Sequence, residues 1–321
     1  MLRLSRAAFA HSVLLSALAA VVPRGARAQG LIPIRATITP IYYDAVPILY
    51  AQRTGMFVKA GIDLQLGRLP NGAAITAAVA GGNLDVGKSS FPTLVSAFGH
   101  GVPITVIAPG AVYDAKSPNS ALIVAKDSAI QSVADLNGKV IAVNDLTSPN
   151  RLAINQWLEQ HGQSKDAVKY VEITMSAMTP ALDDHRVDGA MLTAPIMDEA
   201  LATGKYRAVA PVMSFIAPRS LFSAYFAIRD WAEGHKDAVK RFADVVVASA
   251  AYTNAHHTEL TALIAELVGF PPATIARMTW PVGGTALVVA EIQPVIDIAA
   301  KYGYVAKRFA AREMIFDPKK A

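Results

Sequence analysis

The sequence contains no cysteine, and this absence removes several classes of chemistry. Disulfide bonds, thiolate metal sites, cysteine nucleophiles and a lipid-modified N-terminal cysteine are all excluded. A chain without disulfides must be held together by its apolar core. With 53% hydrophobic residues over 321 positions it can form one, most naturally as two lobes of ordinary domain size.

Long apolar runs are missing after the first 28 residues. Within residues 1–28, Arg3 and Arg6 precede an apolar stretch that ends in the small-x-small triplet Ala26-Arg27-Ala28. This order predicts a signal peptide that is cleaved before Gln29. The apolar stretch is interrupted and ends short of the about 20 residues that a membrane helix needs, which argues against an anchor. The two arginines are not adjacent, which argues against a twin-arginine signal.

A strong net charge is missing from the mature chain. The full sequence has 30 basic and 25 acidic residues, but four arginines and no acid lie in the leader. The remaining 26 basic and 25 acidic residues give a net charge of +1, which argues against nucleic acid or an anionic membrane as a partner. We therefore expect a freely diffusing monomer in the periplasm of a Gram-negative bacterium.

Short β-rich runs alternate with helical patterns along the mature chain, which indicates α/β lobes built on parallel sheets. The expected strands are 34–39, 62–66, 84–87, 104–108, 121–125, 140–143, 170–173, 189–192 and 221–228. The expected helices are 46–54, 73–80, 93–98, 152–161, 180–185, 194–203, 236–255, 259–268 and 286–302.

Two stretches echo each other across the chain. Residues 77–87 and 181–190 each turn from a helix into a buried strand headed by an aspartate, Asp85 or Asp188. A paired acid and base is one interpretation. However, ligands of open α/β sheets bind at the carboxyl ends of strands, whereas both aspartates stand where a strand begins. We expect them to bind turn amides instead.

Several motifs together resemble a known family. They are Thr39-Pro40, Gly55-Met56-Phe57, 60–64, 80–87, Gly101-Val102-Pro103-Ile104, 135–143 and 186–190. In order and spacing they are similar to the bacterial solute-binding proteins that serve importers of nitrate, sulfonates, taurine and thiamine-precursor pyrimidines. The resemblance covers nearly the whole mature chain. One departure is Ala194, which stands where many relatives carry an acid before the proline, and it weakens the thiamine-precursor option.

The resemblance implies a type II periplasmic binding protein fold, in which two parallel-sheet lobes are joined by a two-strand hinge and hold a ligand cleft between them. The crossovers would fall near 111–120 and 212–224. After the signal peptide, residues 29–115 would form the first part of lobe 1 and residues 116–217 lobe 2. Residues 218–321 would return to lobe 1 and add the C-terminal helices.

Candidate ligand contacts lie where strands end and helices begin, because these points converge on the cleft and helix N-termini offer free amides. They are Tyr42, Tyr43, Asn71, Lys88, Ser89, Ser90, Tyr113, Thr147, Ser148, Asn150 and Thr193. The Lys88 ammonium could bind a carboxylate or sulfonate, or could instead pair with Asp85 or lie in solvent. The adjacent tyrosines could flank a planar ligand or pack in the core. Ser148 could bind the ligand or cap its helix.

No other pattern indicates catalysis, a cofactor or a metal. His256, His257 and Glu259 share a short stretch, but adjacent residues of a helix point about 100° apart, so a solvated helix face is the better interpretation. The glycine pairs match no phosphate-binding loop, and no serine lies in a nucleophile elbow. We therefore expect no enzyme, no cofactor and no metal site.

Together these features predict the solute-binding component of an ABC importer. It would capture a small anionic organic molecule, aromatic in one interpretation, and deliver it to a membrane permease. Two alternatives remain open. One is a sensor module that presents its ligand to a membrane receptor. The other is a pyrimidine-related enzyme of the same fold, although the cysteine chemistry associated with such an enzyme is excluded here.

Overall fold

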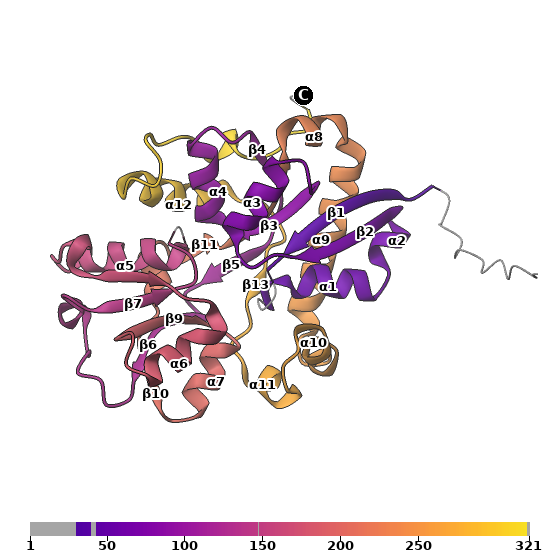
Figure 1. Ribbon diagram of the computed structural model, residues 1–321. Coiled ribbons are helices and arrows are strands. Elements are labelled where there is room, and N and C mark those ends of the chain that lie inside the picture. The colour runs from indigo at the N-terminus through magenta and orange to yellow at the C-terminus, as the bar shows by residue number, and fades with distance from the viewer. Residues whose placement is uncertain (1–29, 40–42, 147, 320–321) are drawn as a thin grey trace, which may run out of the picture.

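A computed structural model describes residues 30–39, 43–146 and 148–319. Two five-stranded sheets lie side by side, and each is covered by helices (Figure 1). The sheet of the first lobe has the order β2-β1-β3-β12-β4. Its strands are β1 (Ile32–Ile38), β2 (Ile62–Arg68), β3 (Val86–Ser90), β4 (Ile104–Pro109) and β12 (Ser223–Ile228).

The sheet of the second lobe has the order β10-β6-β9-β7-β8. Its strands are β6 (Ser120–Ala125), β7 (Val140–Val143), β8 (Lys169–Glu172), β9 (Gly189–Thr193) and β10 (Tyr206–Ala210). Both sheets are mixed rather than purely parallel. In each, the strand that enters from the other lobe, β12 or β6, runs antiparallel to its neighbours. The two lobes therefore share one topology.

A three-stranded sheet joins the lobes, in the order β11-β5-β13. Its strands are β5 (Ala111–Asp114), β11 (Arg219–Leu221) and β13 (Val282–Gly283). The predicted type II fold is confirmed, but the two-strand hinge needs a correction because β13 adds a third strand. The single strand predicted at 221–228 is also wrong in part. Its first residue, Leu221, ends β11 of the hinge, Phe222 lies between the strands, and residues 223–228 form β12 of the first lobe.

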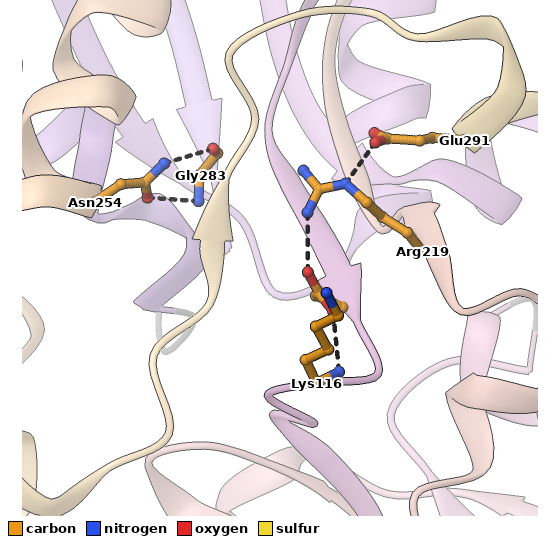
Figure 2. A network of polar contacts seen from close by, with 6 residues as sticks. Lys116, Arg219, Asn254, Gly283 and Glu291 are labelled. Carbon is orange, nitrogen blue, oxygen red and sulfur yellow. Dashed lines mark hydrogen bonds and ion pairs between the residues drawn. The ribbon is translucent and has the colours of Figure 1, made fainter.

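Polar contacts fasten the hinge to its surroundings (Figure 2). Arg219 donates to Asp114 Oδ2 over 3.1 Å and to Glu291 Oε1 over 2.5 Å, which links β11 to β5 and to the following helix α12 (Val289–Lys301). Asn254 exchanges two hydrogen bonds of 2.9 Å with the backbone of Gly283. All three hinge strands are thus fixed to the first-lobe helices or to each other.

The other α-helices have the following bounds. They are α1 (Val46–Arg53), α2 (Met56–Lys59), α3 (Gly72–Ala80), α4 (Phe91–Gly99), α5 (Pro149–Gln160), α6 (Met178–Asp183), α7 (Ile196–Ala202), α8 (Arg229–Gly234), α9 (Lys236–His256), α10 (Thr261–Val268) and α11 (Pro272–Arg277). The pair α10–α11 contacts both lobes. Ile264 and Ile275 belong to the apolar cluster of the second lobe, whereas α10 also packs on α1. The domain boundaries given above stay a prediction.

Asp85 and Asp188 occupy equivalent places in the two sheets. Asp85 accepts a hydrogen bond of 2.8 Å from the amide of Arg35 in β1, and Asp188 accepts one of 2.8 Å from the amide of Val140 in β7. Each carboxylate therefore joins the start of its own strand to the neighbouring strand. These contacts account for both aspartates without an acid–base role.

The core runs without a break from the first lobe to the second. One apolar cluster includes Leu94 of the first lobe, Val112 and Tyr113 of the hinge and Leu152 of the second lobe, all at most 2% exposed. Burial of side chains of this size stabilises the fold by about 1.5–3 kcal/mol each. The apolar core can therefore hold the lobes together without disulfides.

Candidate functional site

Strand ends and helix starts from both lobes meet at a cavity of about 40 Å³ between the two larger sheets. By the size of a water site, this volume holds about three water molecules. Its walls are Thr39, Asp44, Gly72, Lys88, Ser89, Ser90, Asn144, Asp145, Pro149, Asn150, Thr193, Phe222 and Ser223. We call it the polar cavity, because most of these residues carry a hydrogen-bonding or charged side chain.

Four residues of its walls have a buried polar atom with no hydrogen-bond partner among the described residues. These atoms are Asp44 Oδ1, Ser89 Oγ, Asn150 Oδ1 and Thr193 Oγ1. Ser148 Oγ, between the wall residues Asp145 and Pro149, is in the same condition. We call these five the orphan atoms. Buried polar groups are almost always paired in native proteins, and an unpaired one costs about 1–3 kcal/mol.

The orphan atoms come from both lobes. Asp44 and Ser89 belong to the first lobe, and Ser148, Asn150 and Thr193 to the second. Three of the five are hydroxyls, which can donate as well as accept. A small polar ligand in the polar cavity would therefore contact both lobes at once, which is what ligand-driven closure of two lobes requires.

Lys88 lies inside the site but already has a counter-ion. Its side chain is 4% exposed and forms an ion pair with Asp44 Oδ2, an oxygen that also accepts a hydrogen bond of 2.7 Å from Ser223. The expected alternative partner, Asp85, binds Arg35 instead. The ammonium is therefore balanced by a buried carboxylate and does not present a free positive charge to a ligand.

Tyr225 of β12 stands opposite Lys88 in the sheet and is fully buried. Burial, and secondarily the charge of Asp44, raises the pKa of Tyr225 well above its ordinary value. Its phenol therefore stays protonated at neutral pH. The first-lobe wall of the polar cavity thus combines a neutralised Lys88–Asp44 pair with a neutral phenol behind it.

Two helices begin at the polar cavity. The Asn71 side chain caps α3 by accepting from the amide of Ala74 over 2.9 Å, so Asn71 acts here as a cap. Gly72 follows, and a Cβ there would lie 2.2 Å from Ser89 Oγ, so any larger residue would displace the Ser89 hydroxyl from its place in the cavity wall. Ser148 stands at the cap position of α5, yet its side chain makes no capping bond. The cap interpretation of Ser148 is therefore not what the structure shows.

The remaining predicted contacts are placed as follows. Tyr42 and Thr147 lie outside the described residues, and Tyr43 opens a short 3-10 helix, η1 (Tyr43–Ala45). Tyr113 does not line the polar cavity; its hydroxyl contacts Ser214 Oγ over 2.7 Å behind the hinge. Ser90 lines the cavity while its hydroxyl contacts Thr93 over 2.6 Å. Ser89, Asn150 and Thr193 are brought together as expected.

Asn144, Asp145 and Ser223 are wall residues that are not among the predicted ligand contacts. Asn144 and Asp145 directly follow β7, so the rule of strand ends could have found them. Ser223 could not be found in that way, because β12 is antiparallel and brings its first residue to the edge where β3 ends, opposite Ser90. Asp44 follows the first strand but needs the fold to bring it to Lys88.

Among the residues that the structure describes, no group of three or more histidines, cysteines or acids could hold a metal ion. Within the same residues, no helix combines the length and apolar character that crossing a membrane requires.

The two mixed sheets and the sheet that joins them place the chain in the class of type II periplasmic binding protein folds. Residues 43–259 match the NMT1/THI5-like family, and the chain belongs to this family. The predicted family resemblance is therefore confirmed.

The similar proteins are consistent with that class. The chain is 28% identical over 204 residues to the taurine-binding periplasmic protein of Escherichia coli. The aligned region covers 62% of this chain and 61% of that protein. It thus spans less than two thirds of that relative's length. The alkanesulfonate-binding protein SsuA from Xanthomonas axonopodis pv. citri, bound to MOPS, superposes with a TM-score of 0.73 at 18% identity, over 88% of this chain and 98% of the other.

An enzyme also has this fold. The desulfurization enzyme DSZB superposes with a TM-score of 0.63 at 15% identity, over 88% of this chain and 96% of the enzyme. At such low identities the likeness shows the fold alone, so function must be argued from the site.

Proposed function

We propose that this chain is the periplasmic solute-binding component of an ABC importer and that it binds a small organosulfonate between its lobes. The observation that carries the proposal is the set of five orphan atoms from two lobes, of which four belong to wall residues of the polar cavity and the fifth, Ser148 Oγ, belongs to the residue just before the wall residue Pro149. A sulfonate has three acceptor oxygens, and the hydroxyls of Ser89, Ser148 and Thr193 can each donate to one. The start of α5 adds a favourable dipole for an anion.

The proposed recognition uses hydrogen bonds rather than a free cation. Because Lys88 is paired with Asp44, the anion would be held by neutral donors and by the helix start. Neutral donors in a buried site bind an anion without the cost of desolvating an unpaired lysine. Contacts from both lobes would favour the closed form, and that form would be the one delivered to a permease.

Calorimetry and thermal unfolding with taurine, ethanesulfonate, propionate, nitrate and a pyrimidine test this proposal. We expect the sulfonates to stabilise the protein most. At a ligand concentration 100 times the Kd the gain is about 2.7 kcal/mol, which raises the Tm by about 5 °C. If only a neutral compound stabilised the protein, the organosulfonate proposal would be wrong. If a stabilising compound were turned over catalytically, the binding-protein proposal would be wrong.

The periplasmic location is a separate proposal that rests on the leader. We propose export and cleavage after Ala28. Mass spectrometry of the protein recovered from the periplasm of an expressing Gram-negative host should give a mature chain that starts at Gln29. Recovery of the uncleaved chain in the membrane fraction would contradict it.

A further inference from the structure

A second cavity, of about 240 Å³, lies beside the hinge and shares one wall residue, Asp44, with the polar cavity. Its walls include Pro47 of α1, His257 after α9, Ala111 of β5 and the segment Trp280–Gly283. We call it the hinge cavity. By the same measure it is several times larger than the polar cavity, which has room for a ligand's head group and little more.

Apolar and aromatic side chains make up most of the walls of the hinge cavity. The rings of Trp280 and His257 lie 5.0 Å apart with an angle of 38°. Two of the polar side chains in the walls, Asn254 and Thr253, already have hydrogen-bond partners. Asn254 uses its amide on the backbone of Gly283 (Figure 2), and Thr253 Oγ1 bonds to the carbonyl of Ser249 over 3.0 Å. Such a cavity suits an aliphatic or aromatic group.

Asp44 adds one polar requirement to this apolar space. Its Oδ2 is occupied by Lys88 and Ser223, whereas its Oδ1 is one of the orphan atoms. A carboxylate oxygen can only accept, so the group that completes it must be an N–H or O–H donor. An ammonium satisfies this need best, because hydrogen bonds between charged groups are the stronger ones.

We propose that the hinge cavity is a second subsite, which takes the apolar body of an N-substituted aminosulfonate whose sulfonate occupies the polar cavity. The ammonium of that solute would lie between the cavities on Asp44 Oδ1, and its N-substituent would pack against Trp280. This inference rests on the proposed function and deepens it. It selects a solute larger than taurine, with a cation between its two ends.

The two sides of the hinge cavity belong to different lobes. Trp280 follows Thr279, which binds Asp198 of the second-lobe helix α7 through its amide over 3.3 Å and its hydroxyl over 3.4 Å. Pro47 belongs to α1 and His257 follows the end of α9, and these two helices pack together on the first lobe. A body that fills the space between these walls would therefore favour closure in addition to binding.

Calorimetry with a matched pair of probes tests the subsite. Taurine and N-cyclohexyltaurine share the sulfonate and the amine and differ only in the ring. We expect the wild-type protein to bind N-cyclohexyltaurine at least tenfold more tightly than taurine. Trp280→Ala should bring this ratio close to one, because the cyclohexyl ring loses its contact, and Trp280→Phe should keep most of the preference.

Trp231→Ala provides the matched control. Trp231 is also half-buried and stacks on a histidine, His235, with ring centroids 4.7 Å apart, but it lies outside both cavities. Its loss should leave the ratio of the two affinities at the wild-type value. An equal fall of the ratio in both variants would overturn the proposal, because it would show a general effect of tryptophan loss.

The failure of the subsite and the failure of the proposed function have different signatures. If taurine binds but N-cyclohexyltaurine binds no tighter, the subsite is overturned and the organosulfonate proposal stands. If neither sulfonate binds, the organosulfonate proposal is wrong. In that case phenethylammonium, which has the donor and the ring without a sulfonate, decides the subsite. Stabilisation of the wild type but not of Trp280→Ala supports it, and no stabilisation of either overturns it.

Discussion

Ser148 and Ser249 each have a buried hydroxyl, but only that of Ser249 has a hydrogen-bond partner among the described residues. Ser148 Oγ is an orphan atom at the polar cavity, whereas Ser249 Oγ donates to the carbonyl of Pro47 over 2.6 Å. Removal of an unpaired hydroxyl costs the folded protein little, but removal of a paired one leaves a buried carbonyl without its donor. The two serines therefore separate binding from stability.

We expect Ser148→Ala to change the free energy of unfolding by less than about 0.5 kcal/mol and to weaken ligand binding by about tenfold. Ser249→Ala should lower the free energy of unfolding by about 1 kcal/mol and leave affinity unchanged. Urea unfolding and calorimetry with the best sulfonate measure both quantities. An unchanged affinity in Ser148→Ala would remove Ser148 from the proposed site.

The Lys88–Asp44 pair makes a second prediction at single residues. Both side chains are buried, so Lys88→Met leaves the charge of Asp44 without its cation and should lower the free energy of unfolding by about 3–5 kcal/mol. The double variant Asp44→Asn with Lys88→Met removes both charges and should recover most of that loss. Urea unfolding of both variants checks the expectation. A Lys88→Met protein of wild-type stability would show that the pair does not hold the site.

At the scale of elements, the alternation of strands and helices is what the sequence predicts best. β7 has the predicted bounds, and α1 and α9 differ from theirs by a residue at one end. Local properties of the sequence mark such elements, for example the apolar run of β7 and the helix-stopping Gly55 after α1. β13 has neither, because it is a two-residue strand that exists only through its pairing with β5.

The limits for the site have the same physical origin. Ser89 and Thr193 are predicted from strand ends, which is a rule about parallel strands, and Asn150 is predicted from the start of a helix. Ser223 enters through an antiparallel strand, and the counter-ion of Lys88 lies 44 residues away along the chain. Such partners depend on how distant segments meet, and the sequence carries no local signal for them.

Asp198 of α7 accepts hydrogen bonds from Thr279, the residue before Trp280, and its carboxyl makes the stability of the protein depend on pH. Burial raises the pKa of Asp198 from 3.8 to about 6, although the hydrogen bonds from Thr279 lower it. Between these values the folded state binds more protons than the unfolded state, so stability falls as the pH rises from about 4 to about 6. Because the carboxyl is partly exposed, we expect a loss on the order of 1 kcal/mol.

Urea unfolding between pH 4 and pH 7 measures this loss. Asp198→Asn should flatten the profile over that range while it keeps one acceptor oxygen for Thr279. Asp135→Asn is the control of opposite sign, since hydrogen bonds from the amides of Gln131 and Ser132 lower the pKa of Asp135. Its removal should reduce the loss of stability at the acid end instead. An Asp198→Asn profile parallel to the wild type would contradict the assignment.

At the scale of the whole molecule, the end of the chain closes the two lobes against each other. The segment from α12 onward packs on α4 and reaches β4 through Ile315, so it belongs to the first lobe. From there Tyr302 donates to Gln156 of α5 and Tyr304 donates to the carbonyl of Leu146, both over 2.9 Å. Burial raises the pKa of Tyr304 to about 12, so this hydroxyl keeps its proton at neutral pH.

We expect removal of both hydroxyls, in Tyr302→Phe with Tyr304→Phe, to shift the ligand-free protein toward an open form. Each bond contributes about 1 kcal/mol to the closed state, so their loss favours opening by at least tenfold. Small-angle X-ray scattering should show a larger radius of gyration without ligand and the wild-type value with saturating ligand. Affinity should fall by no more than the same factor, because binding must then supply the cost of closure.

Tyr206→Phe distinguishes this effect from a general loss of a tyrosine hydroxyl. Tyr206 donates to Asp183 over 2.5 Å, and both residues belong to the second lobe. Its loss should lower stability without a change in the radius of gyration or in affinity. If the double variant scattered and bound like the wild type, the contacts between α5 and the chain end would not contribute to closure. The closed arrangement would then depend on the hinge sheet and on the continuous core, in which no single hydroxyl has much weight.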